Sequence, residues 1–235
     1  MVVLGVDTAT PDAVVGVAVH GEPVREVQVP PGHDGMPSHA RALLPEIDRS
    51  VELAGGWERI DRIAVGIGPG SFTGLRIGIS TARALAQARD IPIAAVGSLA
   101  ALARRISRGR KDGSLALPVI DARRGEAFAA LFEADGGEIW EPFVAPPAEL
   151  AERLRELDRP PLAAGDGALR FAAGLEAAGA TVAPPEDPIH HLAARDVCAA
   201  GEAASEAPPD QIQPLYLRPP DAKRWIERDR SGPGG

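Results

Sequence analysis

Residues 63 to 80 read IAVGIGPGSFTGLRIGIS and carry the pattern that decides the fold. An apolar run rich in isoleucine and valine leads into the turn Gly68-Pro69-Gly70, and residues that suit a helix start follow, so the pattern predicts a buried strand, a tight turn and a helix. Ser71 and Thr73 are both candidate N-caps. At helical spacing, one stripe of this helix is apolar and consists of Leu75, Ile79, Ala82 and Ala86. The adjacent stripe, called the small-residue stripe below, consists of Gly74, Gly78, Thr81 and Leu85.

The glycines of this stretch admit three interpretations, because each one in a helix costs about 1 kcal/mol relative to alanine and is expected to permit a close approach. A phosphate cradle at a helix N-terminus is the first. Its spacing would require a second glycine five residues after Gly68 or Gly70, with a lysine beside it, and neither is present. The dinucleotide spacing G-x-G-x-x-G fails as well. The glycines are therefore expected to face either their own sheet or a helix of another subunit.

The composition bounds the class of protein. The chain has 235 residues, of which 45% are hydrophobic and 25% are charged, so one large or two smaller globular domains are expected. No apolar run approaches the roughly 20 residues of a membrane span, and the first residues do not resemble a signal peptide. Cys198 is the only cysteine, which is typical of a cytoplasmic protein without disulfides.

The two halves of the chain repeat one order of elements, βββαβαβα, judged from valine-rich runs, helical periods and turn residues. Asp7 and Asp121 each close the first strand of their half, with an offset of 114 residues. Such a duplication is typical of the α/β fold of actin, hexokinase and Hsp70. The predicted domains are residues 1–108 and 109–207. An extended, proline-rich tail follows at 208–235, which we expect to pack along the protein through Leu215, Tyr216 and Leu217 and to end in disorder at Ser231 to Gly235.

A nucleotide site of this fold would need a magnesium-holding aspartate and a glycine-rich phosphate turn in each half. Asp7 and Asp121 stand where such aspartates belong. A proline without an N–H donor follows the first, and the bulky Arg123 and Arg124 follow the second, where phosphates would need room. A degenerate site is therefore expected rather than a complete one. Two further candidates, which fit either the remnant of an adenosine-contacting turn or an ordinary connection, are Gly165 and Gly167.

Metal and nucleophile sites are not predicted. His39 is followed four residues later by Leu43, so a second ligand on that helical face is missing. His190 and His191 are adjacent and would point about 100° apart on a helix. No Ser, His and Asp grouping is recognisable. The chain is therefore expected to have no independent active site, no metal and no cofactor of its own.

The run Gly68 to Gly78 resembles the signature of the TsaB (YeaZ) family, bacterial proteins required to make threonylcarbamoyladenosine in tRNA. Four further segments are similar to that family: VDTAT at 6–10, SHARALLP at 38–45, IDARRGE at 120–126 and PLYLR at 214–218. The resemblance covers almost the whole chain and is weak only between about residues 133 and 209.

The resemblance implies a non-catalytic partner and activator of the TsaD-type threonylcarbamoyl transferase, acting at the adenosine next to the anticodon. It also implies a TsaE-type ATPase as a second partner and a homodimer formed through the same face, and it leaves open a nucleotide at the interface with the transferase. Catalytic TsaD relatives carry a His-x-x-x-His pair where this chain has only His39. The predicted partner interface consists of Gly74, Gly78, Thr81, Ala82 and Leu85, with Leu43, Leu44 and Ile47. Gly78→Arg is accordingly expected to leave the monomer folded and to abolish pairing.

A net charge of −8 argues against tRNA binding by this chain alone, because such proteins usually neutralise phosphates with a basic surface. The run Arg104 to Lys111 is dense in cations and could contact tRNA within a complex. Arginine and lysine are also favoured at helix ends and in exposed linkers, so contact with tRNA is expected to be only indirect.

Two other functional classes stay open on the sequence. An ATP-dependent phosphotransferase or ATPase of the same fold would bind magnesium-ATP at Asp7 and Asp121. A metallopeptidase would hold a stoichiometric metal ion, against which the missing partner of His39 counts.

Overall fold

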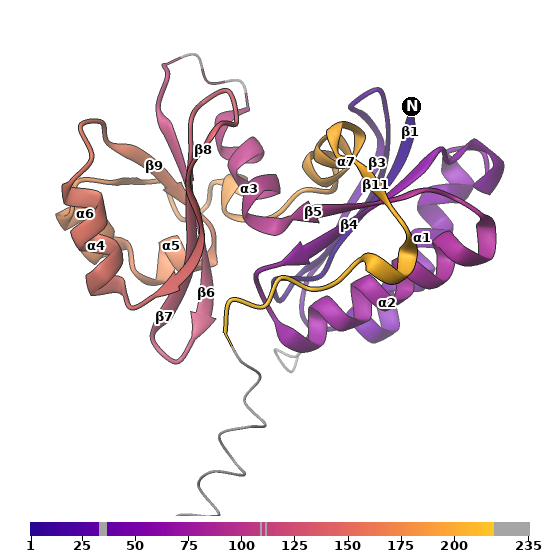
Figure 1. Cartoon of the computed structure of the whole chain (residues 1–235), viewed down its shortest axis with the longest axis horizontal. Coiled ribbons are helices and arrows are strands. Elements are labelled where there is room, and N and C mark those ends of the chain that lie inside the picture. The colour runs from indigo at the N-terminus through magenta and orange to yellow at the C-terminus, as the bar shows by residue number, and fades with distance from the viewer. Residues whose placement is uncertain (33–36, 109, 111, 219–235) are drawn as a thin grey trace, which may run out of the picture.

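The computed structural model describes residues 1–32, 37–108, 110 and 112–218. Two mixed β-sheets stand side by side, with helices between them and on their outer faces (Figure 1). The first sheet has the strand order β11-β5-β4-β1-β2-β3, and the second has the order β10-β9-β6-β7-β8. Each contains an antiparallel meander of three strands that is extended by parallel strands. The predicted α/β duplication is therefore present.

The first half follows the predicted order. Its elements are β1 (Val2–Asp7), β2 (Ala13–Val19), β3 (Glu22–Val29), α1 (His39–Leu53), the 3-10 turn Trp57–Arg59, β4 (Arg62–Gly68), α2 (Phe72–Arg89), β5 (Ile93–Gly97) and α3 (Ser98–Ser107). Residues 63–80 form a strand, a turn and a helix, as predicted. The Ser71 hydroxyl accepts a hydrogen bond from the Gly74 N–H at 3.2 Å, so Ser71 rather than Thr73 is the N-cap. All four members of the predicted apolar stripe of α2 are buried.

The second half repeats the order. Its elements are β6 (Leu115–Arg123), β7 (Glu126–Phe132), β8 (Glu138–Ala145), α4 (Pro147–Arg155), β9 (Pro161–Ala164), α5 (Asp166–Arg170), α6 (Ala172–Ala177), β10 (Thr181–Val182), the 3-10 turn Pro188–His190, α7 (Ala194–Ala203), β11 (Glu206–Ala207) and the 3-10 turn Pro209–Gln211. Helices α4, α5 and α6 are shorter than α1 and α2. The last helix begins only at Ala194, because the Asp187 carboxylate accepts the Ile189 N–H at 3.0 Å and caps a separate turn before it. In the part of the chain that the structure describes, no helix is both long and apolar enough to cross a membrane.

The last helix of each half packs on the sheet of the other half, which corrects the predicted domain boundary. Helix α3 lies on β6 and β7, whereas α7 lies on β1, β2 and β4, and the two helices contact each other between the sheets (Figure 1). The approach of α7 is close, since a Cβ on Gly5 would lie 2.6 Å from Cys198 Sγ. Strand β11 also joins the first sheet, beside β5. Residues 109–207 are therefore not a separate spatial unit, because each half completes the core of the other.

Residues 212–218, called the C-terminal strap below, connect the two sheets. The Leu215 N–H donates to the Ile67 carbonyl at the end of β4, at 2.8 Å. Farther along, the Arg218 guanidinium donates to the Ala122 carbonyl on β6 at 2.7 Å and pairs with Glu126 on β7. The prediction that this segment packs along the protein is confirmed up to Arg218, whereas Ser231 to Gly235 lie outside the described residues.

Candidate functional site

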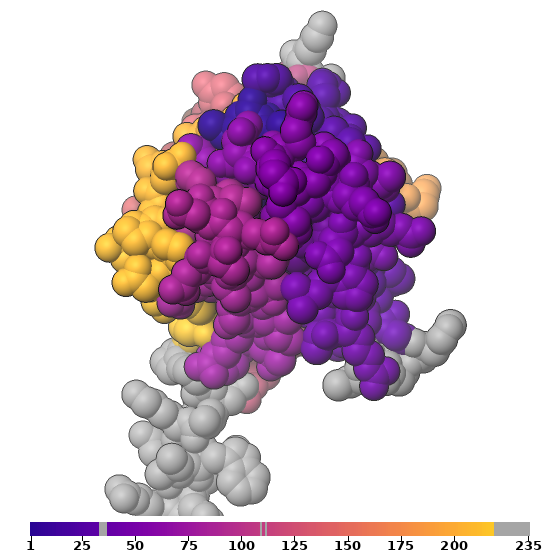
Figure 2. All heavy atoms as spheres, turned by 90° about the vertical axis from the view of Figure 1, so that its right-hand side faces the viewer, coloured from indigo at the N-terminus to yellow at the C-terminus, as the bar shows by residue number. Residues whose placement is uncertain are grey.

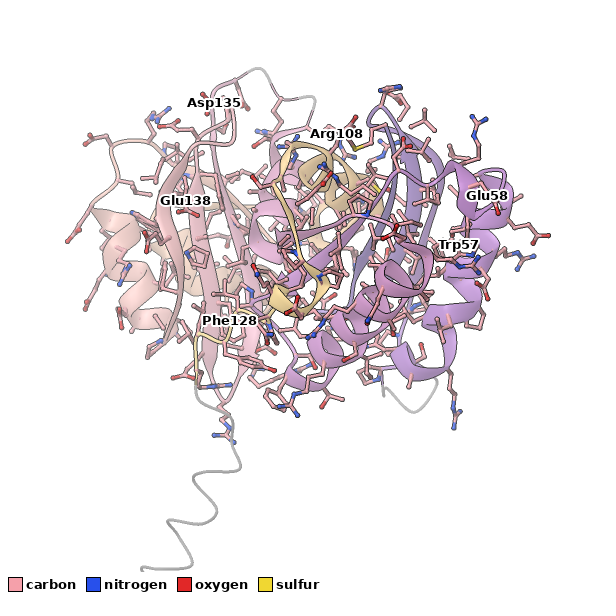
Figure 3. All side chains as sticks on the ribbon, turned by 45° about the vertical axis from the view of Figure 1, so that its right-hand side comes forward. Trp57, Glu58, Arg108, Phe128, Asp135 and Glu138 are labelled. Atoms are coloured by element: carbon pink, nitrogen blue, oxygen red, sulfur yellow. The ribbon has the colours of Figure 1, made fainter. Side chains whose placement is uncertain are left out.

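A cleft of about 650 Å³ lies between the two halves, where the fold would hold its ligand. One wall comes from the ends of β1 and β4 and the start of α2, and the other from the β6–β7 hairpin. The C-terminal strap closes one side of the cleft, and the largely buried Phe128 on β7, labelled in Figure 3, also lines it. The residues that line both walls include Thr10, Ser71, Phe72, Arg76, Asp121, Arg123, Arg124, Asp166, Tyr216 and Arg218.

Asp7 is buried behind this cleft and is not among the residues that line it. Its carboxylate accepts hydrogen bonds from the Ser98 hydroxyl at 2.6 Å and from the Ala9 N–H at 2.7 Å. Gly66 makes room for this group, because a Cβ there would lie 2.0 Å from the carboxylate. Burial raises the pKa of Asp7 to about 6, and the hydrogen bonds lower it only in part.

Asp7 instead organises the two turns above it. The Ser98 hydroxyl that donates to Asp7 also accepts the Gly68 N–H at 3.1 Å, which ties the glycine turn to the carboxylate. The Ala9 carbonyl, in turn, accepts the Ser71 N–H at 2.7 Å. The aspartate predicted as a degenerate magnesium ligand is therefore a structural anchor for the start of α2.

Asp121 does face the cleft, but its charge is already paired. Its Oδ1 accepts the Arg123 N–H at 2.8 Å, and its Oδ2 lies 2.7 Å from Arg170 Nη1 and 3.3 Å from Arg123 Nη1. Two guanidinium groups thus occupy the position where a divalent cation would approach this carboxylate. Both Arg123 and Arg170 neutralise the Asp121 carboxylate. Arg123 was expected to crowd a phosphate, whereas the sequence analysis did not single out Arg170.

Gly165 and Gly167 pack against β6 and do not line the cleft. A Cβ on Gly165 would lie 2.0 Å from the Val119 carbonyl oxygen, and one on Gly167 would lie 2.7 Å from the carbonyl carbon of Ile120. Gly165 also has a positive φ of +118°, a conformation that favours glycine. Of the two interpretations, the ordinary connection between a strand and a helix accounts for both glycines.

The two glycines of the small-residue stripe face their own chain, which corrects their assignment to a partner interface. A Cβ on Gly74 would lie 2.1 Å from the Thr8 carbonyl oxygen, and a Cβ on Gly78 would lie 2.2 Å from Thr8 Oγ1. The Thr8 hydroxyl donates to the Gly74 carbonyl at 2.8 Å across this contact. Gly78→Arg would therefore disturb the monomer itself, contrary to the expectation that it would leave the fold intact.

The other predicted interface residues divide between the core and the surface. Three of them, Leu43, Ile47 and Ala82, are buried in the monomer and therefore belong to its core. Leu44 is 51% exposed, and Thr81 and Leu85 are partly exposed. Figure 2 shows this side of the molecule, where α1 and α2 lie side by side. The surface formed by Leu44, Thr81 and Leu85 is called the α1–α2 face below.

His39 and His190 are both used within the fold. His39 is buried, and its Nε2 lies 3.1 Å from the Pro11 carbonyl oxygen, while burial lowers its pKa. His190 is buried against the Gly165, Ala183 and Pro184 backbone. Across residues 1–32, 37–108, 110 and 112–218, no group of three or more histidine, cysteine, aspartate or glutamate side chains is placed to hold a metal ion.

Part of the basic run at residues 104–111 also has a structural use. Arg105 donates to the Pro188 carbonyl at 2.9 Å, and Arg108 pairs with the buried Asp196. Gly109 and Lys111 lie outside the described residues. These contacts join α3 to the start of α7, as expected for a helix end rather than a dedicated nucleic-acid surface.

An aromatic and cationic cluster at the start of α2 was missed from the sequence. Phe72 stacks on Tyr216 of the strap with ring centroids 5.1 Å apart, and the Arg76 guanidinium carbon lies 4.1 Å from the Phe72 ring centroid. The only signal was the position of Tyr216 in an otherwise proline-rich tail. Its partner lies 144 residues earlier, too far for any local pattern to join them.

Comparisons with known proteins agree with this architecture. Residues 34–206 match the family model described as TsaD, tRNA N6-adenosine threonylcarbamoyltransferase. The tRNA threonylcarbamoyladenosine biosynthesis protein TsaB of Bacillus subtilis is 34% identical over 178 residues, which cover 73% of this chain and 76% of the relative. The solved structure of YeaZ from Pseudomonas aeruginosa has a TM-score of 0.73 at 26% identity, covering 92% of this chain and 99% of that one.

A likeness to the ROK hexokinase of Thermus thermophilus, with a TM-score of 0.51 at 16% identity, concerns the fold alone and confirms the hexokinase-like architecture. The chain thus matches both the transferase model and the TsaB relative. The share of each relative that is covered decides between them, because the TsaB relative is matched over 76% of its length, whereas the tRNA N6-adenosine threonylcarbamoyltransferase of Koribacter versatilis is matched over only 16% of its length. The buried Leu43, four residues after His39, agrees. The chain therefore belongs to the TsaB (YeaZ) family of tRNA threonylcarbamoyladenosine biosynthesis proteins.

Proposed function

We propose that this protein acts in the formation of threonylcarbamoyladenosine in tRNA, as the non-catalytic partner and activator of a TsaD-type threonylcarbamoyl transferase. The observation that carries the proposal is the state of the two aspartates. Asp7 is bound to Ser98 and Ala9 behind the cleft, and the Asp121 charge is paired with Arg123 and Arg170. Neither carboxylate is available to hold magnesium for phosphoryl transfer in the way the enzymes of this fold require. This favours the partner role over the ATP-dependent phosphotransferase.

The α1–α2 face is the surface we assign to the transferase. Leu44 is a large apolar side chain that is 51% exposed on α1, and Thr81 and Leu85 on α2 extend the surface beside it. Buried Leu43 and Ile47 on one side and Ala82 on the other fix the two helices against the first sheet, so the face is rigid before binding. A preformed apolar patch of this kind lowers the entropic cost of association.

The same face serves self-association, so the homodimer and the complex with the transferase exclude each other. A TsaE-type ATPase joins the complex of the two proteins, and any nucleotide at the interface is held jointly with the transferase. With a net charge of −8, this chain contacts tRNA only indirectly.

The test of the role is depletion of this protein in its host, followed by mass spectrometry of nucleosides from total tRNA. Loss of threonylcarbamoyladenosine while the transferase is still present is the expected result. Restoration by the wild-type gene controls for effects on neighbouring genes. An unchanged level of the modified nucleoside would overturn the proposed function.

The test of the interface is Leu44→Arg, compared with Leu53→Arg on the same helix. Leu53 is 61% exposed and, nine residues later, points to the opposite side of α1, so it is a matched control. A buried, unpaired arginine at an interface costs several kcal/mol, so Leu44→Arg is expected to weaken pairing with the transferase by at least about a hundredfold. Equal affinities of the two variants in a calorimetric titration would rule out this face.

A further inference from the structure

The two halves of the molecule are joined in different ways on the two sides of the cleft. On one side, α3 and α7 lie between the sheets, and one apolar core contains residues of both halves, among them Val3, Ala64, Ala116 and Leu162. On the other side, the cleft of about 650 Å³ separates the halves, and the C-terminal strap crosses from one to the other (Figure 1). Two bodies that pack along one edge and are open along the other have the geometry of a hinge.

The strap is fixed to the first half by contacts along most of its length. Ile212 is only 2% exposed and belongs to the apolar core of the first sheet. The Leu215 N–H donates to the Ile67 carbonyl at 2.8 Å. Tyr216 stacks on Phe72 at the start of α2, with ring centroids 5.1 Å apart. The strap therefore moves with the first sheet and α2.

Arg218 anchors the other end of the strap to the second half. Its guanidinium donates to the Ala122 carbonyl on β6 at 2.7 Å and pairs with Glu126 on β7. One side chain thus makes two charge-assisted contacts across the cleft. The side chains of Arg218 and Glu126 remain 22% and 34% exposed, so water can replace these contacts without unfolding either half.

The strap also occupies part of the opening that it crosses. Leu215, Tyr216, Leu217 and Arg218 line the cleft together with the start of α2 and the β6–β7 hairpin. A segment that is anchored at both ends opposes separation of the halves, and side chains within the opening oppose its closure. The angle between the halves is therefore held by α3 and α7 on one side and by the strap on the other.

We propose that the C-terminal strap is a latch that holds the two halves at one angle, with Arg218 as its release point. When the Arg218 guanidinium leaves Ala122 and Glu126, the halves rotate about the α3 and α7 pair, and the cleft changes width while each sheet stays intact. The device is conformational and involves no bond making or breaking. It belongs to the isolated chain and does not depend on the proposed partnership with a transferase.

The test is the distance between two spin labels, one on each half, measured on the full-length protein by double electron–electron resonance. Asp48→Cys on α1 and Glu152→Cys on α4 place the labels at exposed positions. Cys198 is buried, so it does not compete for the label. A single narrow distance distribution is expected for the latched protein. Arg218→Gln should add a second population and raise the ratio of unlatched to latched molecules about tenfold, since two charge-assisted contacts are lost.

Arg159→Gln is the matched control for loss of an arginine. Arg159 also pairs with a carboxylate, that of Glu133, and donates to a backbone carbonyl, that of Gly113 at 3.3 Å, but all three residues belong to the second half. This variant should leave the distance distribution unchanged. Arg218→Lys keeps a positive charge beside Glu126 and should recover most of the latched population.

Two further measurements examine the latch independently of Arg218→Gln. Tyr216→Ala loosens the end of the strap on the first half and should shift the distribution in the same direction. Raising the salt concentration from about 0.1 M to about 1 M shortens the screening length from roughly 10 Å to roughly 3 Å. The second population should therefore grow with salt in the wild type and stay constant in Arg218→Gln.

Identical distance distributions for the wild type, Arg218→Gln and Tyr216→Ala would overturn the proposal, and so would an equal response to Arg159→Gln. A second population that appears together with a loss of far-ultraviolet circular dichroism would overturn it as well, because it would report unfolding rather than rotation of the halves.

Discussion

Asp7→Asn is expected to change how the stability of this protein depends on pH. The carboxylate is 1% exposed and accepts hydrogen bonds from Ser98 and the Ala9 N–H. Burial raises its pKa from 3.8 to about 6 in the folded state. Asparagine has nearly the same shape and no charge at any pH. Its oxygen can accept the Ala9 N–H, while its amide donates to the Ser98 hydroxyl.

The sign and size of the effect follow from the shift. The folded state binds this proton more tightly than the unfolded chain, so its stabilising contribution is complete below about pH 4, falls as the pH rises, and is lost above about pH 6. A shift of about two pKa units corresponds to about 3 kcal/mol. The difference in unfolding free energy, Asp7→Asn minus wild type, is therefore expected to become more positive by about 2–2.5 kcal/mol between pH 4 and pH 7, because the unfolded carboxylate is already partly ionised at pH 4.

The assay is urea denaturation of both proteins from pH 4 to pH 8, with equal m-values as the condition for comparison. Asp48→Asn, at an exposed position of α1, is the control and should show no such trend. A flat difference for Asp7→Asn across this range would refute the reasoning that the buried carboxylate resists ionisation.

Three further predictions concern packing and reactivity. Gly78→Ala places a Cβ 2.2 Å from Thr8 Oγ1 and should destabilise the protein by about 1–3 kcal/mol. Gly174→Ala on α6, with no neighbour within 4 Å, should be neutral or stabilise the protein by up to about 1 kcal/mol. Chemical denaturation compares the two variants directly, and equal effects would contradict the packing argument. Arg62→Leu removes a guanidinium that donates to the Gly201 carbonyl at 2.8 Å and to the Ala204 carbonyl at 3.0 Å, at the end of α7. This variant should lower the free energy of unfolding by at least about 2 kcal/mol. An unchanged denaturation midpoint would show that α7 is held by its apolar contacts alone. Burial raises the pKa of Cys198 to about 12. The native protein should therefore not react with a thiol reagent at neutral pH until urea unfolds it. Rapid labelling of the folded protein would contradict the burial of Cys198 between α7 and the first sheet.

Much of the fold was predictable because its signals are local. Residues 63–80 contain a complete strand, turn and helix, and the apolar stripe of Leu75, Ile79, Ala82 and Ala86 is buried as its period indicates. The order of elements in the two halves, the repeated aspartates and the missing histidine partner of His39 are equally legible, since each depends on spacing along one segment. The family resemblance adds the biological process to this framework.

The tertiary structure decided which neighbour each surface meets. Sequence pattern could not tell that Gly74 and Gly78 face Thr8 of the same chain rather than another subunit, because a small residue permits close approach without naming its partner. Nor could it show that α3 and α7 are exchanged between the sheets, since helical periodicity specifies a buried face and not the sheet that buries it. Arg76, Arg124 and Arg218 come together at one cleft only when both halves and the strap have packed. Local composition and spacing determined the elements and the family, and contacts between residues far apart in the chain determined the cleft.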